Sequence, residues 1–299
     1  MNSTLSVVKP IPITPAMLVS TDVPETDYPD WSSGATYAAG ARVIKNHRIW
    51  ESSESGNVGH DPEASPEYWA EVEAVNRWRA FDKVINTQTK QATKITYRLK
   101  PGVAWSTIAA LNVTAGTSMT VKVYHGSTLV KEVTVGLWLN ASGTGWWNWF
   151  FGSRFRPTQV VINDLPGLQS AEVVIEINGT ADLGVGLILV GRQRYFGTGV
   201  LRGARVGITD YSRKERDDWG NVQIVERAFS RRASFPMKLL PHEVDEFFRF
   251  ISDMRATPCL WSAGQRFECT TVFGLMANAE PVISFFDYTE VELQIEGVV

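Results

Sequence analysis

The chain has 299 residues and a mass of 33.3 kDa, and its 44% apolar and 20% charged residues are a globular composition that excludes disorder along the whole length. A net charge of −3 does not make nucleic acid or a membrane the expected main partner. No apolar run approaches the roughly 18 residues of a membrane-spanning helix, and the first twenty residues lack the pattern of a secretory signal, so we expect no membrane insertion.

Charge divides the chain near residue 75. Residues 1–75 carry four basic and eleven acidic side chains, whereas the remainder carries 25 basic and 21 acidic ones. With the patterns described next, this predicts four parts: an extended arm at 1–30, a small β module at 31–75, a β-sandwich at 76–196 and an α+β domain at 197–299. The expected fold class is mainly β and multidomain, with antiparallel sheets.

The first part contains five prolines: Pro10, Pro12, Pro15, Pro24 and Pro29. Proline fixes φ and keeps the preceding residue out of the helical region, which predicts an extended segment. Apolar residues such as Val7, Val8 and Ile11 lie between the prolines. They favour an arm laid across a neighbouring subunit over a disordered terminus, since a solvated tail has no use for them.

In the second part, residues 42–44 and 47–51 predict two strands around a turn at Lys45-Asn46. About forty residues can bury only a small core, so aromatic rings must supply most of it. The aromatic residues assigned to this core are Trp31, Tyr37, Trp50 and Trp69.

The third part reads as short strands separated by turns. Residues 119–124 alternate, with Val121 and Val123 on one face, and further strands are predicted at 160–162, 173–177 and 187–190. Short strands with frequent turns predict a sandwich or jelly roll.

A dense aromatic group follows Gly145: Trp146, Trp147, Trp149, Phe150 and Phe151. In a strand, Trp147 and Trp149 would share one face. Two interpretations remain open. The rings pack in the sandwich core, or Trp146, Trp147 and Trp149 form a platform that stacks on a sugar ring or a protein.

The fourth part contains the clearest helix signal, which begins at Pro241. Its apolar residues Val244, Phe247, Phe248, Ile251 and Met254 form one stripe at helical spacing. Strands are predicted at 222–229, 269–273 and 291–296, and the last alternates with its acidic and amide groups outward.

Residues 192–232 contain ten basic and five acidic side chains with interleaved aromatics. Such a pattern is compatible with single-stranded nucleic acid, but also with a subunit interface in which arginine pairs with a neighbour's carboxylates. The acidic first part offers that complement, so the interface is favoured. Its candidate residues are Arg205, Arg213, Lys214, Arg216, Arg231 and Arg232.

Candidate catalytic groups are scarce. The four histidines lie far apart, and Cys259 and Cys269 match no compact metal motif, so they are expected to be reduced and mostly buried. The densest acidic pair, Asp217-Asp218, lies in a stretch typical of a solvated or subunit-facing loop. We expect no catalytic residues, no metal and no cofactor, and therefore no enzyme.

Residues 36–43, Arg48-Ile49-Trp50-Glu51 and the closing Trp69 resemble the small carbohydrate-binding modules of the chitin-binding type. Trp31, Tyr37, Trp50 and Trp69 occupy the matching positions. Sugar-binding members carry exposed aromatics after the second strand, where this chain has residues 52–57, Ser-Ser-Glu-Ser-Gly-Asn. The resemblance therefore implies the fold of the module without its usual stacking surface.

Over residues 31–299 the sequence resembles tail proteins of long-tailed bacteriophages. The features that carry this likeness are the small module, residues 76–82 (Asn-Arg-Trp-Arg-Ala-Phe-Asp), the sandwich, residues 207–214 and the ending at 293–297. The sandwich itself is similar to galactose-binding-like jelly rolls. The resemblance implies a structural protein of the tail tip or baseplate, assembled in the host cytoplasm and located in the virion tail.

The partners implied are other tail proteins, further copies of the chain and, through the glycan-binding alternative, host surface glycans. That alternative is a carbohydrate-binding, lectin-like adsorption protein. A glycan hydrolase is a weaker alternative, because no pair of acids can be placed.

Overall fold

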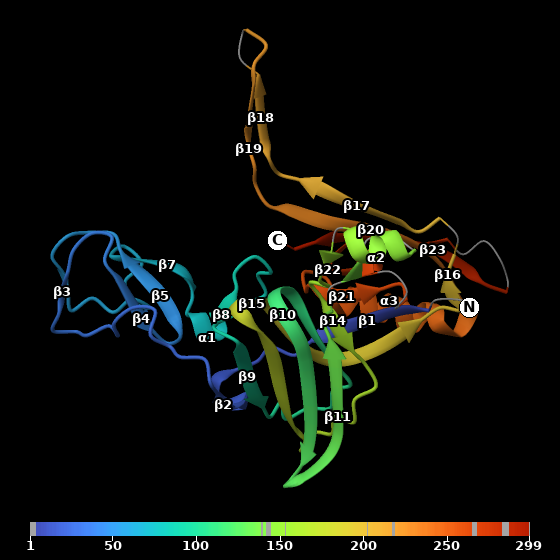
Figure 1. The fold of residues 1–299 in the computed structure, drawn as a ribbon, viewed down its shortest axis with the longest axis horizontal. Coiled ribbons are helices and arrows are strands. Elements are labelled where there is room, and N and C mark those ends of the chain that lie inside the picture. The colour runs from blue at the N-terminus through green and yellow to red at the C-terminus, as the bar shows by residue number, and fades with distance from the viewer. Residues whose placement is uncertain are drawn as a thin grey trace. The chain divides into compact units, whose positions relative to one another are not determined.

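The structure, a computed structural model, describes residues 4–138, 140–141, 145–152, 154–201, 203–216, 219–264, 268–282 and 287–298. The chain forms two compact units (Figure 1). We call residues 12–104 and 108–189 the N-terminal unit, and residues 1–11, 105–107 and 190–299 the C-terminal unit. Both consist mainly of antiparallel strands, which confirms the predicted fold class.

The N-terminal unit contains most of the short elements. They are η1 (Pro15–Met17), β2 (Leu18–Thr21), β3 (Thr36–Tyr37), β4 (Arg42–Lys45), β5 (Arg48–Ser52), β6 (Asn57–Val58), β7 (Trp69–Ala74), α1 (Asn76–Arg79), β8 (Thr89–Gln91), β9 (Lys94–Leu99), β10 (Thr107–His125), β11 (Thr128–Gly136), β12 (Asn140–Ala141), α2 (Trp146–Phe151), β13 (Arg154–Phe155), β14 (Val160–Ile162) and most of β15 (Glu172–Phe196).

The C-terminal unit contains the end of β15 and the elements around one helix. They are β1 (Leu5–Pro10), β16 (Gly199–Val200), β17 (Arg205–Asp210), β18 (Arg213–Arg216), β19 (Val222–Val225), β20 (Phe229–Leu239), η2 (Pro241–Glu243), α3 (Val244–Asp253), β21 (Cys259–Ser262), η3 (Glu268–Thr270), β22 (Thr271–Val282) and β23 (Thr289–Gly297).

The small module is built on the three-stranded sheet β4-β5-β7. Lys45 pairs with Arg48, so the turn between β4 and β5 is centred on Asn46-His47, one residue later than predicted. Both turn residues have positive φ, 48° and 66°. That is the conformation of the tight hairpin turns whose twist matches the strands, and asparagine tolerates it well.

In the sandwich region, β10 pairs with β11 and β14, while β15 pairs with β8 and β9. Val121 and Val123 are fully buried, as their alternation predicts. The predicted strands at 173–177 and 187–190 belong to one continuous strand, β15. Gly179 lies within it, where a Cβ would sit 2.6 Å from the backbone oxygen of Ala115, so this glycine permits a close approach of two strands.

The sheet of the C-terminal unit has the strand order β15-β1-β21-β22-β23-β20. Helix α3 packs Phe247, Phe250 and Ile251 into the core of this unit, and Met254, which directly follows the helix, joins them. The predicted stripe is wrong at one position: Phe248 is 56% exposed and Phe250 is buried instead. Both residues are three or four positions from a buried neighbour, so the spacing alone does not choose between them.

Strand β1 corrects the prediction for the start of the chain. It lies between β15 and β21, with Leu5 opposite Phe196 and Val7 opposite Trp261. Leu5, Val7 and Val8 are buried. These apolar residues are therefore covered by the chain's own sheet and not by a neighbouring subunit, because pairing on both edges satisfies their backbone groups and buries their side chains.

Candidate functional site

A two-stranded ribbon, β18 with β19, projects from the end of β17 and β20 (Figure 1). Among the described residues, these two strands pair only with each other, and all eight of their residues are exposed. Val222, Ile224 and Val225 are exposed by 52%, 62% and 47%. An isolated two-stranded hairpin is at best marginally stable in water, so this ribbon is a surface expected to be covered.

The base of the ribbon is held by Asp210. Its carboxylate accepts the backbone N–H of Ser212 at 2.9 Å and the ammonium of Lys214 at 3.1 Å. The hydrogen bonds from Ser212 and then Lys214 lower the pKa of Asp210 to about 2. The Asp210 carboxylate at the base of the ribbon therefore stays ionised well into the acid pH range.

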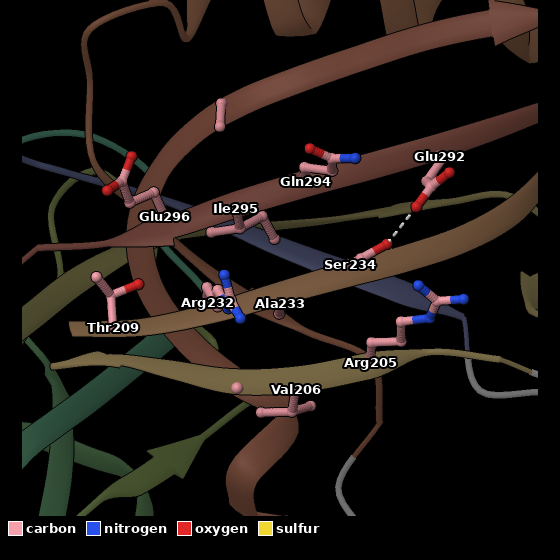
Figure 2. Close-up of a pocket in the computed structure, with 12 residues that line it drawn as sticks. Arg205, Val206, Thr209, Arg232, Ala233, Ser234, Glu292, Gln294, Ile295 and Glu296 are labelled. Atoms are coloured by element: carbon pink, nitrogen blue, oxygen red, sulfur yellow. Dashed lines mark hydrogen bonds between the residues drawn. The ribbon is translucent and has the colours of Figure 1, made fainter.

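The predicted interface residues lie in three places. Arg205 and Arg232 line an open groove of about 660 Å³ on the outer face of β17, β20 and β23, together with Glu292 and Glu296 (Figure 2). In this groove Ser234 Oγ donates to Glu292 at 2.8 Å. Arg213, Lys214 and Arg216 lie on the ribbon, and Arg231 lies on β20 opposite Ile208.

The tryptophans predicted as a platform lie in a hairpin. We call β12, α2 and β13 the aromatic hairpin, since Asn140 pairs with Phe155 and the short helix lies between the two strands. Residues 146–151 form a helix, so the shared face that a strand would give Trp147 and Trp149 does not arise. Gly145, with φ 101°, precedes the helix, and the backbone N–H of Gly152 donates to Asn148 O at its end. The aromatic residues between these glycines have only a small intrinsic penalty in a helix, so they do not prevent it.

The interpretation that these rings pack in the sandwich core is contradicted by their exposure. Trp146, Trp147 and Trp149 are exposed by 71%, 61% and 62%. Trp147 lies at 81° to Trp146, and Trp149 at 88° to Phe150. The planes of the rings therefore point in several directions, and the rings do not form one flat stacking platform.

The aromatics of the small module serve its interior. Trp69 is 2% exposed, donates its indole N–H to the backbone oxygen of His60 at 3.0 Å and meets Tyr37 edge-on at 5.2 Å. Trp50 donates to Lys45 O at 3.3 Å, and the Lys45 ammonium lies 4.5 Å from the ring centre of Trp31. Trp69 is therefore buried, whereas Trp31, Tyr37 and Trp50 are half-buried and each makes a contact within the module.

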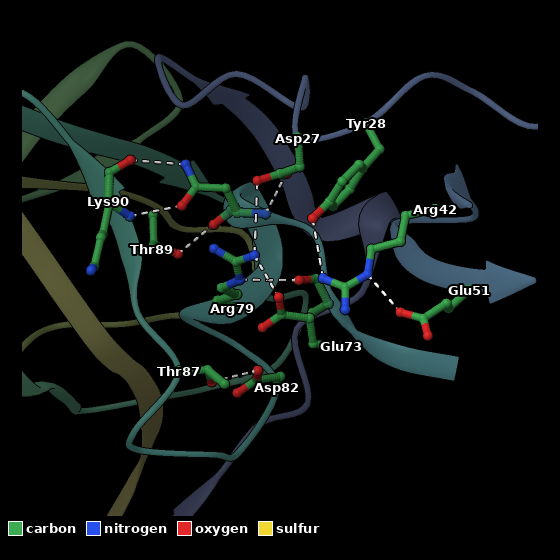
Figure 3. Close-up of polar contacts among 12 residues, drawn as sticks. Asp27, Tyr28, Arg42, Glu51, Glu73, Arg79, Asp82, Thr87, Thr89 and Lys90 are labelled. Carbon is green, nitrogen blue, oxygen red and sulfur yellow. Dashed lines mark hydrogen bonds and ion pairs between the residues drawn. The ribbon is translucent and has the colours of Figure 1, made fainter. Parts of the chain in front are cut away.

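Residues 76–82 link the module to the sandwich (Figure 3). The Asn76 side chain donates to Lys90 O and accepts from Lys90 N, both at 2.8 Å. Its backbone N–H donates to Asp27 at 2.8 Å. Arg79 binds Glu73 at 2.9 Å. Trp78 is buried beside Ile44 and Ile49 of the module. The residues of this segment are therefore accounted for by the contacts that join the module to the sandwich.

Other candidate groups do not converge. Within the described ranges, no three His, Cys, Asp or Glu side chains gather to hold a metal ion, and no described helix has the length and apolarity to cross a bilayer. Both cysteines are free, but Cys269 is exposed, contrary to expectation. Burial raises the pKa of the Cys259 thiol to about 12. Asp217-Asp218 lies outside the described residues.

Two features of these surfaces were not predicted from the sequence. Val206 and Ile208 of β17 are exposed by 41% and 61%. Glu280 lies directly opposite Glu292 on the outer face of β22 and β23. The alternation of the last strand predicted its outward acidic residues. It did not predict that β22 pairs with this strand, because pairing partners are not encoded in the local pattern.

No family model matches the chain, and no curated protein matches it significantly. Among solved structures, it is similar to a selenomethionine-labelled variant of chitosan-binding module 1, derived from a chitosanase/glucanase of Paenibacillus sp. IK-5. The identity is 17% and the TM-score 0.23, over 38% of this chain and 83% of that module. A TM-score this low is below the level that indicates a shared fold.

Proposed function

We propose that this chain is a structural subunit of a protein assembly, and that its ribbon is a contact with other subunits. The observation that carries the proposal is the exposure of both faces of β18–β19 with apolar side chains among basic ones. Apolar and arginine-rich surfaces are typical of protein interfaces. In this proposal the chain binds other molecules, and it performs no catalysis and uses no cofactor.

The resemblance to tail proteins of long-tailed bacteriophages supports a more specific form of the proposal. The assembly is then the tail tip or baseplate, formed in the host cytoplasm and carried in the virion. Its members are other tail proteins and further copies of this chain. Immunogold labelling of assembled particles tests this form: label at the tail tip supports it, and label elsewhere or no label contradicts it.

Removal of the ribbon tests the general proposal. In the variant, an Asn-Gly turn replaces residues 213–225. Co-expression of the wild-type chain with neighbouring tail proteins should give a complex by light scattering. The variant should keep its circular dichroism spectrum and lose the complex. A wild-type chain that stays monomeric with every tail protein, or a variant that assembles equally well, would contradict the proposal.

The aromatic hairpin supports a second candidate function, the binding of host surface glycans. Exposed tryptophans stack on sugar rings, and Trp146, Trp147 and Trp149 each expose more than half of their surface. Removal of a stacking ring should cost about 1–3 kcal/mol of binding, by analogy with base–aromatic stacking.

Titration with purified host polysaccharide tests this second function in the three Trp→Ala variants. Equal affinity of wild type and variants would contradict it. Turnover of the polysaccharide would instead point to the hydrolase alternative.

A further inference from the structure

The two faces of the ribbon differ in chemistry. Residues directly opposite in an antiparallel pair point to the same side. Lys214 pairs with Ile224, and Arg216 pairs with Val222, so these four side chains share one face. The other face carries Arg213 and Glu215, which form an ion pair with each other, and their strand partners Val225 and Gln223. The first face is therefore basic and apolar and carries no acidic residue of the ribbon, and its four residues are exposed.

A surface of the opposite character lies on the same unit. The outer face of β22 and β23 carries the carboxylates Glu280, Glu290, Glu292 and Glu296. Val282, opposite Glu290, is 57% exposed. This face is therefore acidic and partly apolar, and it borders the groove shown in Figure 2.

Among the described residues, Glu290 is the one of these four carboxylates with a cation within 4.0 Å. Glu290 has Lys238 at 3.9 Å, and Glu296 lies opposite Arg232. Glu292 accepts only from Ser234 among the contacts of the described residues, and no described cation lies within 4.0 Å of Glu280 or Glu292. Like charges directly opposite on neighbouring strands, with Cβ atoms about 5 Å apart, are destabilising. A cation supplied from outside the chain would relieve this repulsion.

We propose that the ribbon of one copy lies on the β22–β23 face of a second copy, with Lys214 and Arg216 against Glu280 and Glu292. This inference rests on the proposed function and names the partner of the ribbon. The occupant follows from charge complementarity, because the exposed basic residues of the ribbon and the exposed carboxylates of the face carry opposite charge.

The covered area also matches in polarity. Val222 and Ile224 of the ribbon would meet Val282 beside the carboxylates, so apolar surface would leave water together with the ion pairs. Because ribbon and face are different surfaces, each copy would use both, with two different neighbours. Such head-to-tail contacts build a ring where the rotation closes and a filament where it does not.

Two double variants test the contact, Lys214→Glu with Arg216→Glu and Glu280→Lys with Glu292→Lys. All four residues are exposed, so we expect the circular dichroism of the folded chain to be unchanged, and among the described residues the one internal contact that the ribbon variant loses is the ion pair of Lys214 with Asp210. Each double variant should weaken self-association at least tenfold by sedimentation at low salt. The chain that carries all four changes should associate as the wild type does, since the charges are exchanged.

The matched control is Lys83→Glu with Glu54→Lys, both exposed on the N-terminal unit, and it should leave self-association unchanged.

A mixture of two neutral double variants, Lys214→Gln with Arg216→Gln and Glu280→Gln with Glu292→Gln, separates head-to-tail contact from a symmetric one. The variant changed at Glu280 and Glu292 keeps its ribbon, and the variant changed at Lys214 and Arg216 keeps its β22–β23 face, so one contact can form between the two. Native mass spectrometry, with one variant ¹⁵N-labelled, should therefore find a dimer with one copy of each and nothing larger. No mixed dimer, or undiminished association of either variant alone, would overturn the inference.

The neutral variant Lys214→Gln with Arg216→Gln repeats the test if charge reversal disturbs folding. A wild-type chain that is monomeric alone but binds another tail protein through the ribbon would overturn this inference and leave the proposed function standing. A chain that binds neither itself nor any tail protein would overturn both.

Discussion

The small module and the aromatic hairpin are both dense in aromatic residues, but they use them in opposite ways. In the module, Trp69 is 2% exposed and its indole N–H has a backbone acceptor. In the hairpin, Trp147 is 61% exposed and its ring contacts are with other aromatic rings of the same short helix. Aromatic density alone therefore does not separate a core from a binding surface.

The difference follows from local geometry. Side chains alternate between two faces in the sheet β4-β5-β7, so one face can bury its rings together. In a helix, successive side chains are turned by about 100°, so five aromatics within six residues point over more than half of the circumference. No single neighbouring element can cover all of them. The hairpin is therefore the region whose rings are available to a partner.

The largest effect expected from this comparison is on Trp69. Trp69→Ala should lower the free energy of unfolding by about 3–5 kcal/mol, because it leaves a cavity and removes the indole donor to His60. Urea unfolding followed by the circular dichroism of the full chain measures it. A loss below about 1 kcal/mol would show that the module does not depend on this ring.

Tyr37→Phe should have a smaller effect in the same module. The Tyr37 hydroxyl accepts the N–H of Ser32 at 2.8 Å and donates to Ser32 O at 3.2 Å. Loss of these bonds should cost about 1 kcal/mol while the ring contact with Trp69 remains. The same unfolding experiment reports it, and a loss as large as that of Trp69→Ala would contradict the assignment of the ring as the main contact.

Trp147→Ala is the counterpart in the hairpin. Because the ring is mostly exposed, the free energy of unfolding should change by no more than about 0.5 kcal/mol. Iodide quenching of tryptophan fluorescence should fall in the variant, since an accessible ring is removed. Strong destabilisation would mean that the ring packs in a core, and the comparison between the two regions would fail.

Acid should affect the module and not the hairpin helix. A hydrogen bond from Lys45 lowers the pKa of Asp61 below its ordinary value of 3.8. A lowered folded-state pKa stabilises the fold above the ordinary value, and this contribution is lost as the pH falls through the folded-state pKa. Residues 145–152 contain no titratable side chain.

The indole N–H signals report this difference in an acid titration. The signal of Trp31, which lies under Lys45, should shift as Asp61 is protonated, whereas that of Trp147 should not. The Asp61→Asn variant is the control, because it removes the titrating group. A shift of Trp147 alone would contradict the prediction.

Local patterns predicted much of the fold. Alternation located the buried Val121 and Val123, and the last strand buries Val291, Leu293 and Ile295 as its period requires. These segments are long and regular, so the side of each residue is set by the period of the backbone.

Predictions failed where distant segments decide. Strand β1 was assigned to an arm because its pairing with β15 joins residues almost two hundred positions apart. Phe248 was assigned to the core because helical spacing permits it, although α3 buries Phe250. The predicted interface arginines were separated into a groove and a ribbon by the pairing of β17 with β20.

The sequence by itself determined the class of the fold, the periods of its strands and helix, and the positions of its turns to within a residue or so, because these depend on neighbours within a few residues. Only the tertiary structure decided which apolar side chains stay in water. Burial depends on which other element covers a face, and at β18–β19 and the aromatic hairpin the described chain supplies no such element.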